Sequence, residues 1–421
     1  MNFITRQINQ ISIGGMKILV SKFIKFIFLP YFLFALIIVL FIRILNVIFI
    51  IRIGYLLGSR LGHFALNTEL YLCEQLHGIN KPHKKSVDLF FISEDKVCNE
   101  QLEKMLRKQI IILPKILLEP IYLLNKYLPN SKLNEIGFNS QWDRDINNLL
   151  SKTKPFLKFS NRELIIGNKL LGEFGLTLND KFVCLNVRDE AYLNKVLPGN
   201  WTYHNHRNSD INDYIKTAEK LADLGYFVFR MGVHVKNKLI SSNPKIIDYP
   251  FSKLRSEFLD IYLGAKCEFC LSVGSGFDAI PIIFRRPTMY VNCVPIGYIH
   301  TFTKPFINLC KRYFSKKLNR ELKLKEIFLY GLGFSPYNDF YQERDIVFLD
   351  NSPEEIMHAA IEMHNILIGS ITYSKKQLEL QEKFWKIFPV EATDTLGVKL
   401  HGEIYSIYST YFLENNQEWL L

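Results

Sequence analysis

A polar segment near the middle of the chain is rich in cationic side chains. Residues 201–211 read Trp-Thr-Tyr-His-Asn-His-Arg-Asn-Ser-Asp-Ile and include Arg207. Two more arginines, Arg188 and Arg230, stand at the ends of short apolar runs that read as buried strands. Guanidinium groups bind phosphate through paired N–H donors. We therefore expect the three arginines to bind a nucleotide-linked ligand that carries phosphate, with His204 as a further hydrogen-bonding group.

The second half of the chain alternates short apolar runs with stretches of helical periodicity, a pattern typical of a doubly wound parallel α/β sheet. Strands are expected at 182–187, 226–230, 245–248, 269–273, 288–292 and 345–349. Helices are expected at 212–224, 258–265, 306–314 and 353–367. Parallel strands end at one edge of their sheet, where such sheets bind ligands, so Arg188 and Arg230 should meet there.

A glycine-rich turn follows the expected strand at 269–273. Gly274, Ser275 and Gly276 place little side-chain bulk between their backbone amides and a ligand. Amides at the start of a helix attract anions, so this turn is expected to hold part of a diphosphate. Asp278, at the expected start of the next helix, is either a ligand for ribose hydroxyls or a helix N-cap.

The first half offers candidates for proton transfer. Strands are expected at 46–57, 87–93 and 109–113, with a helix at 64–76. His63 lies in the turn before that helix and Glu69 lies on the helix. In a two-domain transferase the acceptor hydroxyl must lose a proton, and either side chain could act as the general base.

Composition narrows the partners. A chain of 421 residues is too long for one ordinary core, and 52 Lys+Arg against 41 Asp+Glu give a net charge of +11. Nucleic acid, an anionic membrane and a sugar nucleotide all suit this charge. The chain has no nucleic-acid-binding motif, so we expect no nucleic-acid partner. The seven cysteines are expected to be reduced, and the lone Cys267-x-x-Cys270 is expected to pack in the core.

An apolar stretch near the N-terminus indicates membrane association. Residues 23–42 contain a single charge, Lys25, and twenty helical residues span about 30 Å, enough to cross a bilayer. The flanking basic residues are nearly balanced, so a spanning anchor, an in-plane or re-entrant helix and a buried core helix all stay open. Reduced cysteines and cytosolic nucleotide donors require the catalytic part to face the cytosol.

A series of short motifs runs in order through residues 180–421. They lie at 187–192, 207–214, 230–232, 248–260, 275–276, 290–295, 352–363 and 412–420. In these motifs the chain resembles a family of uncharacterised bacterial proteins classed as glycosyltransferases of the two-Rossmann (GT-B) architecture. The resemblance implies a donor-binding second domain, and we include Gly232 in its site.

The sequence thus predicts an α/β protein with two Rossmann-like domains, GT-B-like, and an N-terminal apolar membrane-associated helix. The tail and apolar helix are expected at 1–45 and the N-terminal acceptor domain at 46–170. The donor-binding domain is expected at 171–372, followed by a helical tail at 373–421 that packs back on the N-terminal domain.

The expected function is transfer of a sugar from a nucleotide-sugar donor to a cell-surface glycan or lipid-linked precursor. No cofactor and no metal are expected, since no Asp-x-Asp motif follows a strand. The expected location is the cytoplasmic face of the bacterial inner membrane, with the membrane surface as a partner. The alternative is a membrane-anchored protein that binds a nucleotide or glycan without catalysis.

Overall fold

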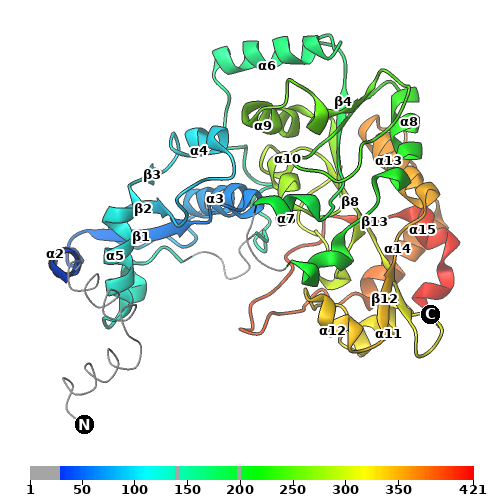
Figure 1. Ribbon diagram of the computed structural model, residues 1–421. Coiled ribbons are helices and arrows are strands. Elements are labelled where there is room, and N and C mark those ends of the chain that lie inside the picture. Colours follow the sequence, from blue (N-terminus) through cyan, green and yellow to red (C-terminus); the bar gives the residue numbers. More distant parts are fainter. Residues whose placement is uncertain (1–28, 138–142, 197–200) are drawn as a thin grey trace, which may run out of the picture. The chain divides into compact units, whose positions relative to one another are not determined.

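The computed structural model describes residues 29–137, 143–196 and 201–421 (Figure 1). The chain forms two compact units. The first unit comprises Met1–Leu57, Asn80–Asp95 and Ile110–Gly137, and the second comprises Gly58–Ile79, Lys96–Gln109 and Phe138–Leu421. These units do not follow the predicted boundaries at 45, 170 and 372, because the segments that connect the first strands belong to the second unit.

The first unit is built on a three-stranded parallel sheet in the order β1-β2-β3. The strands are β1 (Ile50–Leu56), β2 (Ser86–Ile92) and β3 (Ile111–Ile112), which confirms the three strands expected in the first half. Helices α2 (Leu29–Leu45) and α5 (Lys115–Lys126) pack on the sheet through a shared apolar cluster.

Arg52 is the only charged residue in the run 46–57 and is buried in β1. Its Nε donates to Asp88 Oδ1 at 2.8 Å, and its Nη1 donates to the carbonyl oxygen of Asn80 at 2.7 Å. A buried charge is tolerated only when it is paired and hydrogen-bonded, and these contacts meet that condition. They join β1 to β2 and to the loop before β2.

The second unit contains a seven-stranded sheet in the order β13-β9-β8-β7-β4-β5-β6, with every pairing parallel. Its strands are β4 (Phe182–Asn186), β5 (Phe227–Arg230), β6 (Ile246–Asp248), β7 (Phe269–Ser272), β8 (Thr288–Cys293), β9 (Phe306–Cys310) and β13 (Ile407–Tyr408). Chain order runs outward from β4 to β6 and then resumes at β7 on the other side of β4. The predicted doubly wound sheet is confirmed, and its switch point lies between β4 and β7.

Helices cover both faces of this sheet. One face packs on α6 (Asn161–Glu173) and α9 (Glu257–Lys266) through alternate strand residues such as Phe182 and Cys184. The other face, with Val183 and Leu185, packs on α8 (Ile215–Asp223), α13 (Pro353–Leu367), α14 (Lys375–Ile387) and α15 (Thr410–Asn415). The helices expected at 212–224, 258–265 and 353–367 correspond to α8, α9 and α13.

A small antiparallel sheet in the order β11-β10-β12 completes the second unit. Its strands are β10 (Arg312–Ser315), β11 (Arg320–Glu321) and β12 (Ile346–Leu349). The strand expected at 345–349 therefore exists but pairs outside the main sheet. The remaining helices of the second unit are α3 (Leu61–Leu76), α4 (Glu100–Leu106), α7 (Ala191–Val196), α10 (Ala279–Ile283), α11 (Leu324–Leu329) and α12 (Asn338–Gln342).

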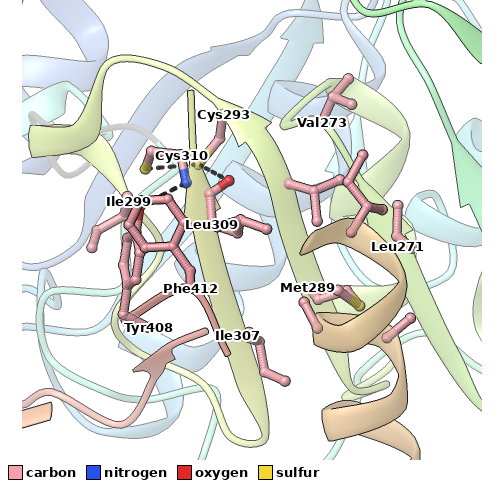
Figure 2. Close-up of a cluster of buried hydrophobic side chains, with 14 of the residues drawn as sticks. Leu271, Val273, Met289, Cys293, Ile299, Ile307, Leu309, Cys310, Tyr408 and Phe412 are labelled. Carbon is pink, nitrogen blue, oxygen red and sulfur yellow. Dashed lines mark hydrogen bonds between the residues drawn. The ribbon is translucent and has the colours of Figure 1, made fainter. Parts of the chain in front are cut away.

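The helix predicted at 306–314 is wrong, because this segment forms β9 and β10. All five residues of β9 are buried, and the strand lies between β8 and β13. Figure 2 shows Ile307 and Leu309 among the side chains of the neighbouring strands. A short apolar run that is buried on both sides lacks the alternation of apolar and polar residues that would distinguish a strand from a helix. The sequence pattern of this segment is therefore compatible with either element.

The C-terminal tail belongs to the second unit and does not form a separate appendage. β13 pairs with β9, and the Cys310 amide donates to the Tyr408 hydroxyl oxygen at 3.0 Å (Figure 2). Tyr408 and Phe412 are buried in the same core as the sheet. The tail also contacts a part of the chain predicted for the N-terminal domain, since Asn148 Nδ2 donates to the Glu403 carbonyl oxygen at 2.8 Å.

The predicted apolar segment 23–42 lies partly outside the described residues. Its described part belongs to α2, which has 17 residues. Across residues 29–137, 143–196 and 201–421, no helix combines the length and the apolar character needed to traverse a bilayer.

Two glycines of α6 provide a test of the packing between α6 and α9. A Cβ at Gly167 would lie 2.2 Å from Cζ of Tyr262, whose hydroxyl is held by Asn168 at 2.8 Å. We expect Gly167→Ala to lower the free energy of unfolding by about 1–3 kcal/mol in urea denaturation. Gly172→Ala, with nothing within 4 Å of its Cβ, is the control and should raise stability by up to about 1 kcal/mol. Equal effects of the two changes would contradict this packing.

Candidate functional site

The carboxyl ends of β4 and β7 lie side by side at the switch point of the sheet. Asn186, the last residue of β4, is in register with Ser272, the last residue of β7. Asn186 Nδ2 donates to Ser272 Oγ at 2.9 Å and to Ser275 Oγ at 2.7 Å. These bonds fix the turn after β7 against the end of β4, where doubly wound sheets form their ligand crevice.

Two of the predicted arginines lie at this edge. Arg188 stands two residues beyond β4, and Arg207 ends the 3-10 helix η2 (Thr202–Arg207). Arg207 Nη2 donates to the carbonyl oxygen of Gly274 at 2.5 Å, so η2 is held against the turn after β7. Both side chains are half-buried.

Within the described part of the chain, no carboxylate lies within 4.0 Å of Arg188 or Arg207, and the charges of Asp278 and Asp143 act on Arg207 from beyond that distance. Burial and the positive charge of Arg207 together lower the pKa of Arg188 to about 9. Burial also lowers the pKa of Arg207. Two like charges kept close together away from water are costly in the free protein, and a bound anion would remove that cost.

The histidines of η2 are neutral at physiological pH. Burial and the charge of Arg207 lower the pKa of His204 to about 4 and that of His206 to about 3. The His204 ring is nearly parallel to that of Trp201, with centroids 6.3 Å apart. His206 packs against the rings of Tyr341 and Phe348. His204 is therefore a neutral ring stacked beside Trp201, and His206 is a core residue.

Arg188 lines a cavity of about 240 Å³ at this edge. The other lining residues are Glu190, Asn194, Trp201, Thr202, Asn205 and Asn208. A second cavity of about 250 Å³ shares Glu190 and Asn208 with the first. Amide, hydroxyl and aromatic groups beside an arginine are the lining expected for a polar ligand that carries phosphate.

The predicted anion cradle at Gly274, Ser275 and Gly276 is not supported. The amide of Gly274 donates to Ser272 Oγ at 3.3 Å, and the amide of Ser275 donates to Asp278 Oδ2 at 2.7 Å. The helix that follows, α10, has only five residues. The first two amides are occupied by the chain itself, and Asp278 forms a capping box with Ser275.

The same turn has a different role, since it allows close contact with α3. A Cβ at Gly62 would lie 3.1 Å from the Cα of Gly276, and a Cβ at Gly276 would lie 3.1 Å from the amide nitrogen of Gly62. Side chains at either position would separate the two backbones. His63, in the first turn of α3 and half-buried, is thereby brought to the turn that contacts Arg207.

The structure commits Arg230 to other partners. Its side chain is 1% exposed, with Nη1 3.0 Å from Asp248 Oδ1 and Nη2 4.0 Å from Asp189 Oδ2. It therefore joins the ends of β5 and β6 to the loop after β4, and it also lines the cavity of about 250 Å³ described above. Gly232 has φ +145°, and a Cβ there would lie 2.6 Å from Val235, so it shapes the loop after β5.

Glu69 is not placed as a general base. Its residue is 1% exposed, and its Oε1 accepts from Arg285 Nη2 at 2.8 Å and from the Phe156 amide at 3.2 Å. Burial raises its pKa, opposed by the Arg285 charge. Glu69 joins α3 to the segment before α6 and to the end of α10, so the prediction that made it a catalytic candidate is replaced by a structural role.

Lys311 is a site residue that the sequence analysis missed. It follows β9 directly, is 5% exposed, and donates to the Asn208 carbonyl oxygen at 2.6 Å and to Asp350 Oδ1 at 2.7 Å. It supports the loop after η2 that lines both cavities. The sequence does contain an indication of this residue, because Lys311 follows an apolar run as Arg188 does. The prediction of a helix at 306–314 concealed it.

No family model matches the chain, and no curated protein matches it. Solved structures do resemble it. ADP-heptose LPS heptosyltransferase II from E. coli covers 76% of this chain and 99% of its own, at 12% identity and a TM-score of 0.40. The match with a glycosyl transferase of family 9 from Veillonella parvula covers 57% of this chain and 80% of the other, at 12% identity and a TM-score of 0.34. The match with the UDP-GlcNAc 2-epimerase from Neisseria meningitidis covers 76% of this chain and 100% of the other, at 11% identity and a TM-score of 0.29.

Glycosyltransferases are thus among the proteins that this chain resembles. The similarities are distant in sequence and in superposition.

The cap at Asp278 predicts a pH-dependent stability. Burial raises the pKa of Asp278 to about 7, whereas an unfolded aspartate titrates near about 3.9. Between these values the folded state holds a proton that the unfolded state has lost, so stability falls as pH rises from about 4 to about 7. Asp278→Asn keeps a side-chain oxygen that accepts from the Ser275 amide but removes the group that titrates. Relative to wild type, the variant should gain stability over this range, by up to about 1.4 kcal/mol per pH unit in denaturant titrations. If the stabilities of wild type and variant changed in parallel with pH, the raised pKa of Asp278 would be contradicted.

Proposed function

We propose that the chain is a glycosyltransferase whose second unit binds a nucleotide-sugar donor. The observation that carries the proposal is the half-buried Arg188 and Arg207 pair at the switch point, for which the described residues provide no carboxylate within 4.0 Å. The leaving group in such a transfer is a nucleoside diphosphate, whose charge grows as the bond to the sugar breaks. Two fixed guanidinium groups offset that charge without a metal in the proposed mechanism.

His63 is the proposed general base. The acceptor hydroxyl oxygen attacks the anomeric carbon, the bond from that carbon to the diphosphate oxygen breaks, and the hydroxyl proton passes to the imidazole. The contact between Gly62 and Gly276 supports this assignment because it brings the start of α3 to the edge that carries Arg207.

The proposed acceptor is a cell-surface glycan or a lipid-linked precursor at the cytoplasmic face of the bacterial inner membrane. Support comes from the exposed apolar residues of α2 and from the donor, since nucleotide sugars are cytosolic. A protein that binds the donor without transferring it is the alternative. Incubation with UDP-, GDP-, ADP-, CMP- and dTDP-sugars distinguishes the two, because only the transferase releases the free nucleotide in the presence of acceptor.

The arginine pair predicts opposite effects on binding and stability. Arg188→Met should weaken nucleoside diphosphate binding at least tenfold, about 1.4 kcal/mol, because it removes a phosphate ligand. The same change should leave unchanged or raise the thermal midpoint of the free protein, because Arg207 then has no like charge beside it. Calorimetric titration and thermal unfolding measure the two quantities.

Two matched changes serve as controls for Arg188→Met. Lys375→Met removes a charge from a side chain that is 93% exposed and should leave nucleotide affinity unchanged. Arg230→Met should instead destabilise the fold by about 3–5 kcal/mol, because it leaves Asp248 without its buried partner. If Arg188→Met binds every nucleoside diphosphate as wild type does, the donor site lies elsewhere.

The base assignment predicts a separation of turnover from binding. His63→Ala should lower turnover by roughly 10²-fold while donor affinity stays near wild type. Steady-state kinetics and calorimetry on the same preparation measure both. Retained turnover would exclude His63, and His204, which is neutral at physiological pH, would be the next side chain to test.

A further inference from the structure

The first unit exposes an unusually large number of apolar side chains. Along α2 and the turn after it, the exposed ones are Phe32, Leu33, Phe34, Ile37, Leu40, Phe41, Ile44, Val47 and Ile48. Phe34 and Ile37 are each 64% exposed, and Ile44 is 70% exposed. A contiguous apolar patch of this kind on a folded protein marks a surface that contacts something other than water.

The opposite side of α2 is already occupied. Ala35, Val39 and Ile42 are buried against Ile53 and Phe91 of the sheet. The helix is therefore apolar on two sides, one of which packs on its own unit. A helix that only filled the core would have a polar outer face.

Helix α5 repeats the arrangement beside α2. Leu118 and Ile121 are buried in the same apolar cluster as the inner side of α2, whereas Ile116, Leu117 and Leu123 are 66%, 55% and 45% exposed. Since both helices turn their inner sides to one cluster, their outer sides face away from it together. We call the exposed apolar residues of α2, the turn after it and α5 the outer face.

Contacts at both ends fix the two helices with the same polarity. The Tyr31 hydroxyl donates to the carbonyl oxygen of Ile116 near their N-terminal ends. Arg43 Nη2 donates to Asn125 Oδ1 at 2.8 Å near their C-terminal ends. The outer face is thus a fixed surface built from two helices.

Exposed cations lie at the C-terminal ends of these helices. Lys84 Nζ donates to the carbonyl oxygens of Asn46 at 3.1 Å and Val47 at 3.0 Å, directly beside the exposed Val47. Lys126 and Lys132, at the end of α5 and just after it, are also exposed. Apolar residues bordered by lysines complement a surface of acyl chains bordered by anionic phosphates.

We propose that the outer face binds in the plane of an anionic bilayer, inserted into one leaflet, with the lysines at the phosphates. One side of α2 is buried against the sheet, so only its other side is free to contact lipid. The proposal specifies the membrane partner of the proposed function and adds α5 to the contact. It requires no sugar transfer, so its test is independent of that activity.

The test uses the full-length protein and preformed vesicles of phosphatidylcholine with one quarter phosphatidylglycerol. We expect the protein to co-sediment with these vesicles, and Ile37→Asp combined with Ile44→Asp to weaken partitioning at least tenfold. Ile165→Asp on α6 of the second unit is the matched control, since Ile165 is as exposed as Ile44, at 70%, and should bind as wild type. Lys84→Glu with Lys126→Glu should weaken binding to the anionic vesicles and leave the weaker binding to pure phosphatidylcholine unchanged.

Three outcomes would overturn the proposal. Wild-type binding by the double aspartate variant would assign any membrane contact to residues outside the outer face. A wild-type dimer that the double variant converts to monomers, without vesicle binding by either, would make a second copy the occupant. Protein that cannot transfer between vesicle populations would indicate a spanning segment. Unchanged thermal unfolding and unchanged nucleoside diphosphate binding in each variant verify that the fold and the donor site are intact.

Discussion

The side-chain amide of Asn186 holds together the part of the second unit on which its site depends. At the switch point, β4 and β7 are neighbours in the sheet although they are not consecutive in the chain. The hydrogen bonds from Asn186 to Ser272 and Ser275 connect the turn after β7 to the end of β4. The turn so held contacts Gly62 and accepts a hydrogen bond from Arg207. A sheet edge, the start of α3 and the cationic segment before α8 are thus connected through the two hydrogen bonds of one side-chain amide.

Cationic side chains fall into two groups according to their partners. Several buried or half-buried cations are matched to a carboxylate, which offsets the cost of removing a charge from water. These pairs are Arg52–Asp88, Arg230–Asp248, Arg285–Glu69 and Lys311–Asp350. Arg188 and Arg207 lack such a match in the described residues, although both are half-buried. The difference in pairing, more than the number of cations, distinguishes a candidate ligand site from structural ion pairs.

Much of the second unit could be predicted from the sequence because its strands and helices alternate with clear punctuation. The helix at 353–367 is an example, since Ser352, Pro353 and Glu355 form its start and the structure has the same bounds. The segment 306–314 could not be assigned, because a short apolar run between two buried strands has no polar face. Lys311 was therefore not recognised as a cation at the end of a strand.

The candidate site was predicted in part for the same reason. Residue types placed Arg188 and Arg207 at the sheet edge, but sequence cannot tell a paired cation from an unpaired one. The carboxylates that engage Arg230 and the cation that engages Glu69 come from distant positions in the chain. Likewise, the glycines at 274 and 276 indicate a tight turn, but their neighbours decide whether the amides face a ligand or the protein. Those neighbours are known only from the three-dimensional arrangement.

The division of the chain into units has a consequence for how such a protein can change over evolution. The boundaries at 57, 79, 95, 109 and 137 mean that the backbone passes back and forth before remaining in the second unit. Helices α3 and α4, which connect strands of one unit, are structural parts of the other. Neither unit is a continuous cassette, so recombination at a single point cannot exchange one for a homologue's. Either unit would therefore have to diversify by substitution within an intact gene, not by shuffling of modules.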